Sequence, residues 1–265
     1  MKFDTRHARS FCNLLTAAVC ILGSGALQAE TVRFAHCLGG CPSGASAGNE
    51  IIARALYTLS FNTENKIADW VAYIVTPGSI GVATNLSRVP LRDPFVSDTL
   101  HPEDFEVSPE GRQIGLSSFA PLVSFAGTPF WSEINYLTNM VPRNSELNRG
   151  SWYGLEWAVR NLANRTDSLY VITGPIYAEE LVAAESGAVE STPYLVPTGF
   201  FKVIVDAEGQ VGSFLFPQDL PFHVHHCDRI VSLGEVERLS GLDLFPELPQ
   251  LPAGDLRESL GCFPR

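Results

Sequence analysis

Residues 139–156 read NMVPRNSELNRGSWYGLE, and the second half of this stretch opens a predicted helix. Apolar residues recur at helical spacing along residues 147–163, so this segment is expected to be helical despite two glycines. Asn148, Trp152 and Glu156 follow one another at four-residue intervals and therefore line one side of that helix. An amide oxygen and a carboxylate on one helix side are hard ligands, which suit Mg²⁺.

The same spacing also has a purely structural interpretation. Asn148 stands near the start of the helix, where asparagine commonly serves as the N-cap. Glu156 stands four residues before Arg160, at the spacing of a surface ion pair. The spacing alone therefore favours a capped, solvated helix over a metal site.

The first 29 residues are predicted to be a secretory signal peptide. Three cations within the first nine residues precede an apolar run over residues 11–27, and the segment ends in Leu-Gln-Ala at Ala29. The run is too short for a confident membrane span, and no later segment is long and apolar enough for one. We therefore expect a secreted or periplasmic protein, free of the membrane after signal cleavage, with residues 30–265 as a single domain.

The charge limits the kind of partner. The chain of 265 residues has a formal net charge of −11, and the signal peptide holds three cations and one anion, so the remainder carries −13. Proteins that bind nucleic acid over a broad surface usually carry a basic face. The charge therefore argues against strong nonspecific binding but permits a confined cationic cleft.

Cysteine usage agrees with export. The chain after residue 29 holds four cysteines, an even number that suits disulfides in an oxidising compartment. Of the three pairings, Cys37–Cys41 with Cys227–Cys262 is favoured, because CLGGC can close a tight loop through two glycines. The alternative is a zinc site that combines Cys37 and Cys41 with the cluster of His223, His225, His226 and Cys227.

The rest of the chain predicts a mixed architecture without repeats or an interdomain linker. Ser232 and Glu235 form a capping-box pattern that opens a second helix, which ends near Ser240. Apolar, β-branched runs separated by turn residues read as strands. This pattern indicates one α+β domain with a central antiparallel sheet flanked by helices. The expected strands are 32–35, 70–76, 134–140, 169–173, 199–205 and 211–216.

Several longer motifs resemble the secreted DNA/RNA non-specific endonuclease family, the ββα-metal nucleases that cut either nucleic acid. The resemblance covers nearly the whole chain after the signal peptide, and both cysteine pairs fit it. The motifs are NYLTNMVPR at 135–143, LNRGSW at 147–152, LE at 155–156, ADWVAY at 68–73, SRxxxxDP at 87–94, DTLxPxDF at 98–105 and APLxSFAG at 120–127.

The resemblance implies a ββα-metal nuclease-like fold and hydrolysis of phosphodiesters with one Mg²⁺. Asn148 matches the asparagine that holds the metal together with several waters, and Glu156 matches a glutamate that orients a metal-bound water. Arg88 matches an arginine that neutralises charge developing on the phosphorane. Asn139 matches an asparagine that lies one layer behind the metal ligand.

The family's Asp-Arg-Gly-His motif, whose histidine is the general base, is replaced here. Counted back from Ala120, the matching residues are Gly115, Leu116, Ser117 and Ser118. A serine hydroxyl cannot accept a proton near neutral pH without a partner, and loss of a positioned base costs ~10²–10⁴ in rate. Leu116 also removes a cation from the phosphate. We therefore predict a catalytically impaired member of the family, a pseudoenzyme.

Two alternatives stay open at this stage. An active nuclease could use a displaced base, for which His101 and the cluster at His223, His225 and His226 are candidates. A non-catalytic protein could bind the DNA or RNA backbone through Arg88, Arg143 and Arg149, or could serve only as an interaction scaffold. The resemblance also makes a homodimer plausible, although no segment identifies an interface.

Overall fold

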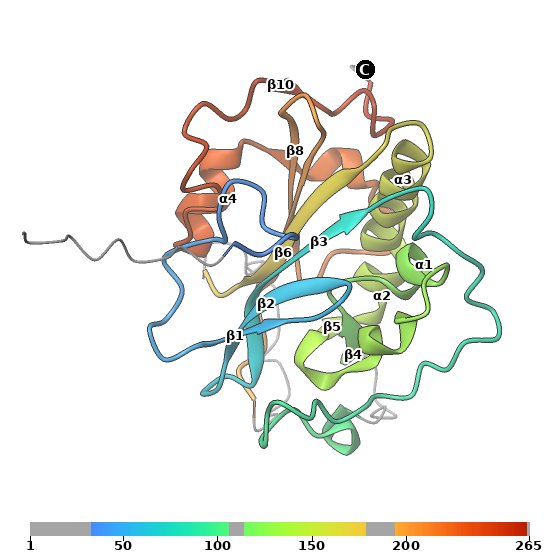
Figure 1. The fold of residues 1–265 in the computed structure, drawn as a ribbon, viewed down its shortest axis with the longest axis vertical. Helices are drawn as coiled ribbons and strands as arrows, with labels where there is room; N and C mark the ends of the chain where they lie inside the picture. The colour runs from blue at the N-terminus through green and yellow to red at the C-terminus, as the bar shows by residue number, and fades with distance from the viewer. Residues whose placement is uncertain (1–32, 106–113, 179–193, 264–265) are drawn as a thin grey trace, which may run out of the picture. The chain divides into compact units, whose positions relative to one another are not determined.

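A single sheet runs through the centre of the fold, with helices on both faces (Figure 1). The computed structural model describes residues 33–105, 114–178 and 194–263. Neighbouring strands are antiparallel, except that β10 runs parallel to β8. The predicted α+β fold is thus confirmed, with one parallel pair added to the sheet. Its order is β1 (Glu50–Ala53), β2 (Tyr57–Asn62), β3 (Ile67–Val75), β6 (Leu169–Ile176), β7 (Gly199–Val205), β8 (Gln210–Pro217) and β10 (Gly254–Asp255), with β9 (Ile230–Val231) against β8.

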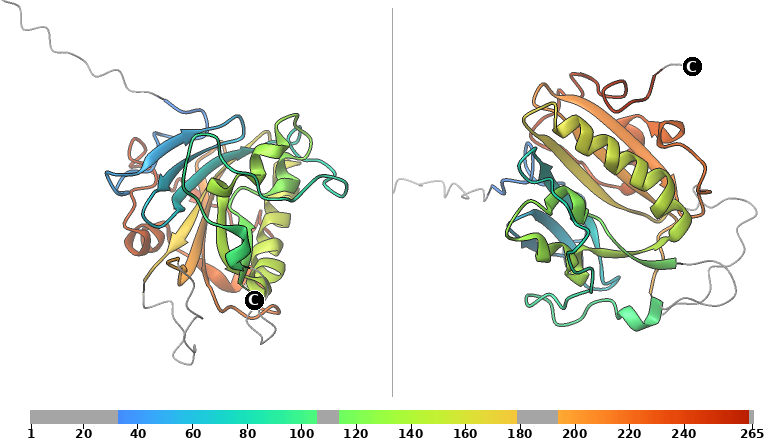
Figure 2. Two further views of the ribbon diagram at one scale, coloured as in Figure 1. Left: turned by 90° about the horizontal axis from the view of Figure 1, so that it is seen from below. Right: turned by 90° about the vertical axis from the view of Figure 1, so that its right-hand side faces the viewer.

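The sheet separates two apolar cores because successive side chains of a strand point to opposite faces. On β3, Val71 and Tyr73 belong to one core, whereas Trp70 and Ala72 belong to the other. Helix α3 (Tyr153–Ala163) packs into the first core, and helix α4 (Leu233–Ser240) packs into the second. Figure 2 (right) shows α3 lying across the front of the sheet, so its outer side is open to solvent.

The predicted helix over 147–163 is confirmed, but it is not straight. It consists of α2 (Ser145–Leu147), a π-helical turn η4 (Asn148–Trp152) and α3. The kink lies at Gly150, whose φ of −91° and ψ of −114° are not helical. A Cβ on this residue would lie 2.5 Å from the carbonyl oxygen of Phe222, so the close approach of that segment requires glycine.

Two predicted strands are wrong. Residues 33–35 form no strand, and Cys37 N instead donates to Phe34 O in a turn. Residues 131–139 form two 3₁₀ turns, η2 (Trp131–Asn135) and η3 (Leu137–Asn139), because the asparagine side chains of this segment bind backbone groups and compete with a strand ladder. A strand begins only at β5 (Met140–Asn144), which pairs with β4 (Ile114–Ser118) in a separate two-stranded sheet.

Both favoured disulfides are confirmed, Cys37–Cys41 and Cys227–Cys262. The zinc alternative is therefore wrong, because its cysteines are consumed in the two bridges. The predicted signal peptide lies outside the described residues, and those from Arg33 onward belong to one compact unit. Within the described part, no helix has the length and apolar character needed to cross a membrane.

Candidate functional site

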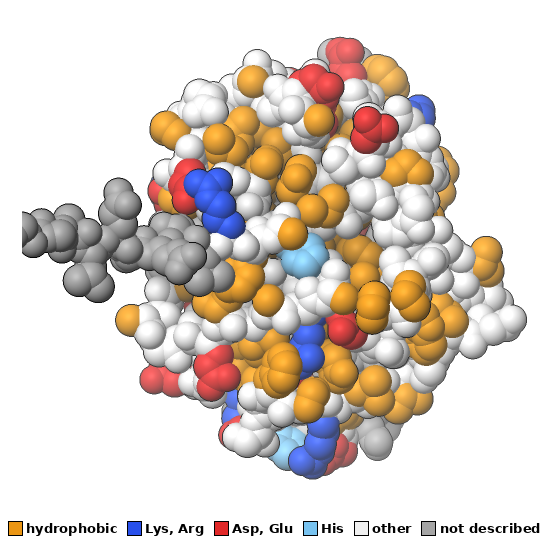
Figure 3. Space-filling view, viewed as in Figure 1, with side chains coloured by type: hydrophobic (Ala, Val, Ile, Leu, Met, Phe, Trp, Pro, Cys, Tyr) orange, Lys and Arg blue, Asp and Glu red, His pale blue; other side chains and the backbone are white. Residues whose placement is uncertain are grey.

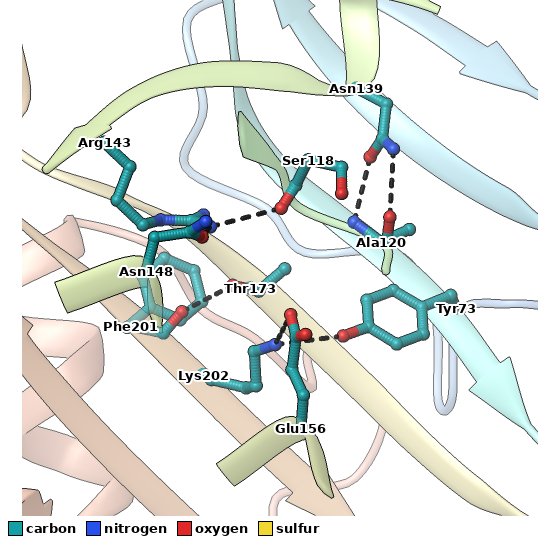
Figure 4. A network of polar contacts seen from close by, with 10 residues as sticks. All are labelled: Tyr73, Ser118, Ala120, Asn139, Arg143, Asn148, Glu156, Thr173, Phe201 and Lys202. Carbon is teal, nitrogen blue, oxygen red and sulfur yellow. Dashed lines mark hydrogen bonds and ion pairs between the residues drawn. The ribbon is translucent and has the colours of Figure 1, made fainter. Parts of the chain in front are cut away.

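A cleft of about 360 Å³ opens where the paired strands β4 and β5 meet the kinked helix. Four of the sequence-predicted residues line it together: Arg88, Ser118, Asn148 and Glu156. They come from a loop, a strand end, the π-helical turn and α3, so the tertiary fold assembles residues far apart in sequence. Figure 4 shows the polar contacts beneath this cleft.

Asn148 does not cap the helix. That role belongs to Asn144, whose side chain accepts from Glu146 N, so the capping interpretation of Asn148 is wrong. Asn148 Oδ1 instead accepts a hydrogen bond of 3.1 Å from Arg143 Nη1, which also donates to Ser118 O at 3.3 Å (Figure 4). One guanidinium nitrogen thus bridges the predicted metal ligand and the predicted base position.

Arg143 is buried below the cleft, with only 1% of its surface exposed. Its guanidinium carbon lies 3.8 Å from the ring centroid of Trp152 and 4.8 Å from that of Phe200. Burial lowers the pKa of Arg143 to about 9, although the charge of Glu156 opposes this shift. Trp152 points into this layer rather than into the cleft, because the kink turns it away from the side shared by Asn148 and Glu156.

Glu156 pairs with Lys202, not with the arginine one turn further along the helix as the structural interpretation expected. Lys202 Nζ lies 3.3 Å from Glu156 Oε1 and donates to the Tyr73 hydroxyl at 3.3 Å (Figure 4). Burial lowers the pKa of Lys202 to about 8, while Glu156 acts in the opposite direction. Our sequence interpretation missed Lys202; its signal is a lysine inside the apolar strand GFFKVIV.

The replaced motif lies in the cleft wall. Leu116, Ser117 and Ser118 all line the cleft, and Ser118 on β4 is paired with Met140 on β5. None of the histidines among the described residues lines this cleft. The His101 ring lies 3.5 Å from the Glu103 carboxylate. The rings of His225 and His226 contact each other in a tilted arrangement, and His226 Nε2 lies 3.3 Å from Leu260 O.

The exposed Arg88 is held in place through its neighbours. Asn135 Nδ2 donates to Ser87 O at 2.9 Å, and Asn135 itself lines the cleft. Further along the same loop, Asp93 is buried, forms an ion pair with Arg54 and accepts a 2.6 Å bond from Thr138. The loop backbone is therefore fixed on both sides of Arg88.

Asn139 lies behind the cleft wall and is fully buried. Its side chain accepts from Ala120 N at 3.0 Å and donates to Ala120 O at 3.2 Å and to Ile134 O at 2.9 Å (Figure 4). It therefore fixes the chain just after Ser118. Arg149, by contrast, is exposed, donates to Ser145 O and does not line the cleft.

The chain resembles known proteins in sequence and in fold. A family model for DNA/RNA non-specific endonucleases matches residues 41–251. The chain is 34% identical over 266 residues to a nuclease of Serratia marcescens, covering 96% of this chain and 97% of that protein. It is 28% identical over 230 residues to nuclease C1 of Cunninghamella echinulata var. echinulata, covering 80% and 89%. A crystal structure of an EndoG/EndoGI complex matches with a TM-score of 0.61 at 24% identity, covering 76% of this chain and 88% of that one.

Proposed function

The chain belongs to the DNA/RNA non-specific endonuclease family, and from this premise we propose that it is a catalytically impaired member whose cleft binds the nucleic-acid backbone. The main support for this proposal comes from the groups that surround Asn148. A serine occupies the base position beside it, and a buried arginine binds its amide oxygen. The two disulfides support an exported, secreted or periplasmic protein built as one domain over residues 30–265.

Hydrolysis needs a group that takes a proton from the attacking water. Ser118 cannot do this alone, and the described lining of the cleft supplies no histidine in its place. Its remaining ionisable groups are Arg88, Arg160, Tyr153 and Glu156, and the last of these is paired with Lys202. A displaced base is therefore unsupported, and we expect a rate far below that of an intact family member.

The donor set fits Mg²⁺ in chemical type but holds it weakly. Asn148 offers one hard amide oxygen, and Glu156 would bind a water of the ion. When bound, the metal would stabilise charge on the phosphate. However, Asn148 Oδ1 already accepts from Arg143, and Glu156 is neutralised by Lys202. Two fixed cations next to these oxygens oppose a third, divalent one.

The same charges favour a phosphate. Arg88 and Arg160 line the cleft directly, while Arg143 and Lys202 lie beneath it, and Glu156 is the one carboxylate among the described lining residues. On the face shown in Figure 3, charged side chains are scattered rather than gathered into a broad basic patch. We therefore expect nucleic acid to bind in the cleft and to bind only weakly to the rest of the acidic surface.

The test uses purified, disulfide-intact protein. Fluorescence anisotropy with labelled oligonucleotides should show binding that is equal in Mg²⁺ and EDTA and that weakens steeply with salt. Supercoiled plasmid should stay intact in parallel. Arg88→Ala should weaken binding, whereas Arg165→Ala, which changes an exposed arginine outside the cleft, should not.

Two results would contradict the proposal. Robust Mg²⁺-dependent nicking that disappears in Asn148→Ala would establish an active nuclease. Absence of nucleic-acid binding at any salt concentration would favour an interaction scaffold. A homodimer stays a prediction of the family resemblance.

A further inference from the structure

Two aromatic side chains project from the solvent side of α3. Tyr153 is 51% exposed and Trp157 is 59% exposed, and their four-residue spacing places them on one face of the helix. The opposite face of the helix packs into the core through Leu155, Val159 and Leu162. Packing of the fold therefore does not explain the aromatic pair.

This pair is continuous with the cleft. Tyr153 itself lines the cleft beside Asn148 and Glu156, and its ring centroid lies 5.7 Å from the guanidinium carbon of Arg160. Trp157 follows one turn later, about 6 Å further along the helix axis. In a nucleic-acid strand with one phosphate bound in the cleft, the neighbouring nucleotides would therefore lie over these two rings.

The surrounding charge is suited to a polyanion. The described lining of the cleft beside Tyr153 contains two arginines, Arg88 and Arg160, and a single carboxylate, although the whole chain has a net charge of −11. That carboxylate, Glu156, is neutralised by Lys202 at the side of the helix that faces the cleft. The cleft next to Tyr153 is thus locally cationic as well as aromatic, the combination used by sites that bind single strands.

The spacing of the rings favours unpaired bases. Successive bases in a duplex strand are stacked on each other at about 3.4 Å, whereas the two rings are separated by about 6 Å along the helix axis. Two neighbouring bases that stack on the two rings, one on each, must therefore be unstacked from each other and unpaired. We propose that Tyr153 and Trp157 form a stacking platform that makes single-stranded nucleic acid the preferred ligand of the cleft; this proposal rests on the proposed function.

The experiment compares three labelled probes in EDTA: a single-stranded oligonucleotide, its duplex, and an abasic strand with the same number of phosphates. Stacking on an aromatic ring contributes roughly five- to hundredfold in affinity per base. The wild-type protein should therefore bind the single strand at least tenfold more tightly than the duplex or the abasic strand. Binding of the single strand should also quench tryptophan fluorescence.

The variant Tyr153→Ala with Trp157→Ala should lose the preference for the single strand, so that its affinities for the single strand and the abasic strand become equal. Both side chains are largely exposed, so the fold should tolerate the change. Phe263→Ala removes an equally exposed aromatic ring outside the cleft and should have no effect.

The outcomes separate the two proposals. Equal affinity of the wild-type protein for all three probes, or an equal loss for all three in the double variant, would overturn the stacking platform while leaving the backbone-binding cleft intact. Absence of binding to every probe would overturn the proposed function and the platform with it; a protein partner on this aromatic face would then be the better explanation.

Discussion

Arg143 Nη1 lies 3.1 Å from Asn148 Oδ1, so a buried cation contacts the amide that the family resemblance assigns to metal binding. The guanidinium is fixed from behind by the Trp152 ring and cannot move away without leaving its aromatic layer. Under the proposed function, this contact favours a phosphate over a divalent metal in the cleft.

Arg143→Gln should tighten Mg²⁺ binding by at least tenfold. The substitution removes a positive charge within a few ångströms of the candidate ligand, where even an effective dielectric constant of about 20 leaves a repulsion of several kcal/mol against a dication. Isothermal titration calorimetry would measure the affinity. Arg165→Gln, which removes an exposed arginine, is the matched control, and an unchanged affinity in a folded Arg143→Gln variant would show that the guanidinium does not limit metal binding.

Restoring the replaced motif should restore some Mg²⁺-dependent plasmid nicking. The change combines Gly115→Asp, Leu116→Arg, Ser117→Gly and Ser118→His; three of these residues line the cleft, and a Cβ at Gly115 would meet open space. Ser118→His alone should restore less, because a base misplaced by about an ångström can lose ~10² in rate.

Asn148→Ala in the same background is the control for this restoration, since it removes the candidate metal ligand. Adding Arg143→Gln should increase the nicking further by relieving the repulsion of the metal. No nicking from a well-folded quadruple variant would mean that the cleft has diverged beyond these four residues.

Lys202 should make the stability of the protein increase with pH. Burial lowers the pKa of Lys202 from 10.5 to about 8, so between these values the unfolded chain binds a proton that the folded protein does not. The free energy of unfolding therefore rises through this window, by at most about 1.4 kcal/mol per pH unit from this group. Between pH 8 and 10.5, the free energy of unfolding measured by urea denaturation should rise more steeply with pH in wild type than in Lys202→Met. Parallel curves for wild type and Lys202→Met would refute the assignment.

Removing the Cys227–Cys262 bridge should lower the melting temperature more than removing Cys37–Cys41. The first bridge spans 35 residues and the second only 4, so chain entropy gives about 4 and about 2 kcal/mol, respectively. Scanning calorimetry of the two double-serine variants would test this order. A larger loss from the four-residue loop would show that native contacts, and not restraint of the unfolded chain, dominate.

The sequence by itself determined the features that depend on neighbours along the chain. Periodic apolar residues predicted the helix over 147–163 and the strands that became β3, β6, β7 and β8. The glycines between Cys37 and Cys41 indicated their bridge, and the motifs indicated the family. These signals are local, because helical spacing, strand alternation and tight loops are each expressed within a few residues.

Only the tertiary structure decided which groups meet in the cleft. Lys202 reaches Glu156 across 46 positions in sequence because β7 lies under α3, and no local pattern encodes that contact. Likewise, the strand predicted over 134–140 gave way to 3₁₀ turns once the side chain of Asn139 bound Ala120 and Ile134. Buried polar groups must find partners wherever the fold offers them, so their pairing, and with it the charge at Asn148, becomes defined only when distant segments pack together.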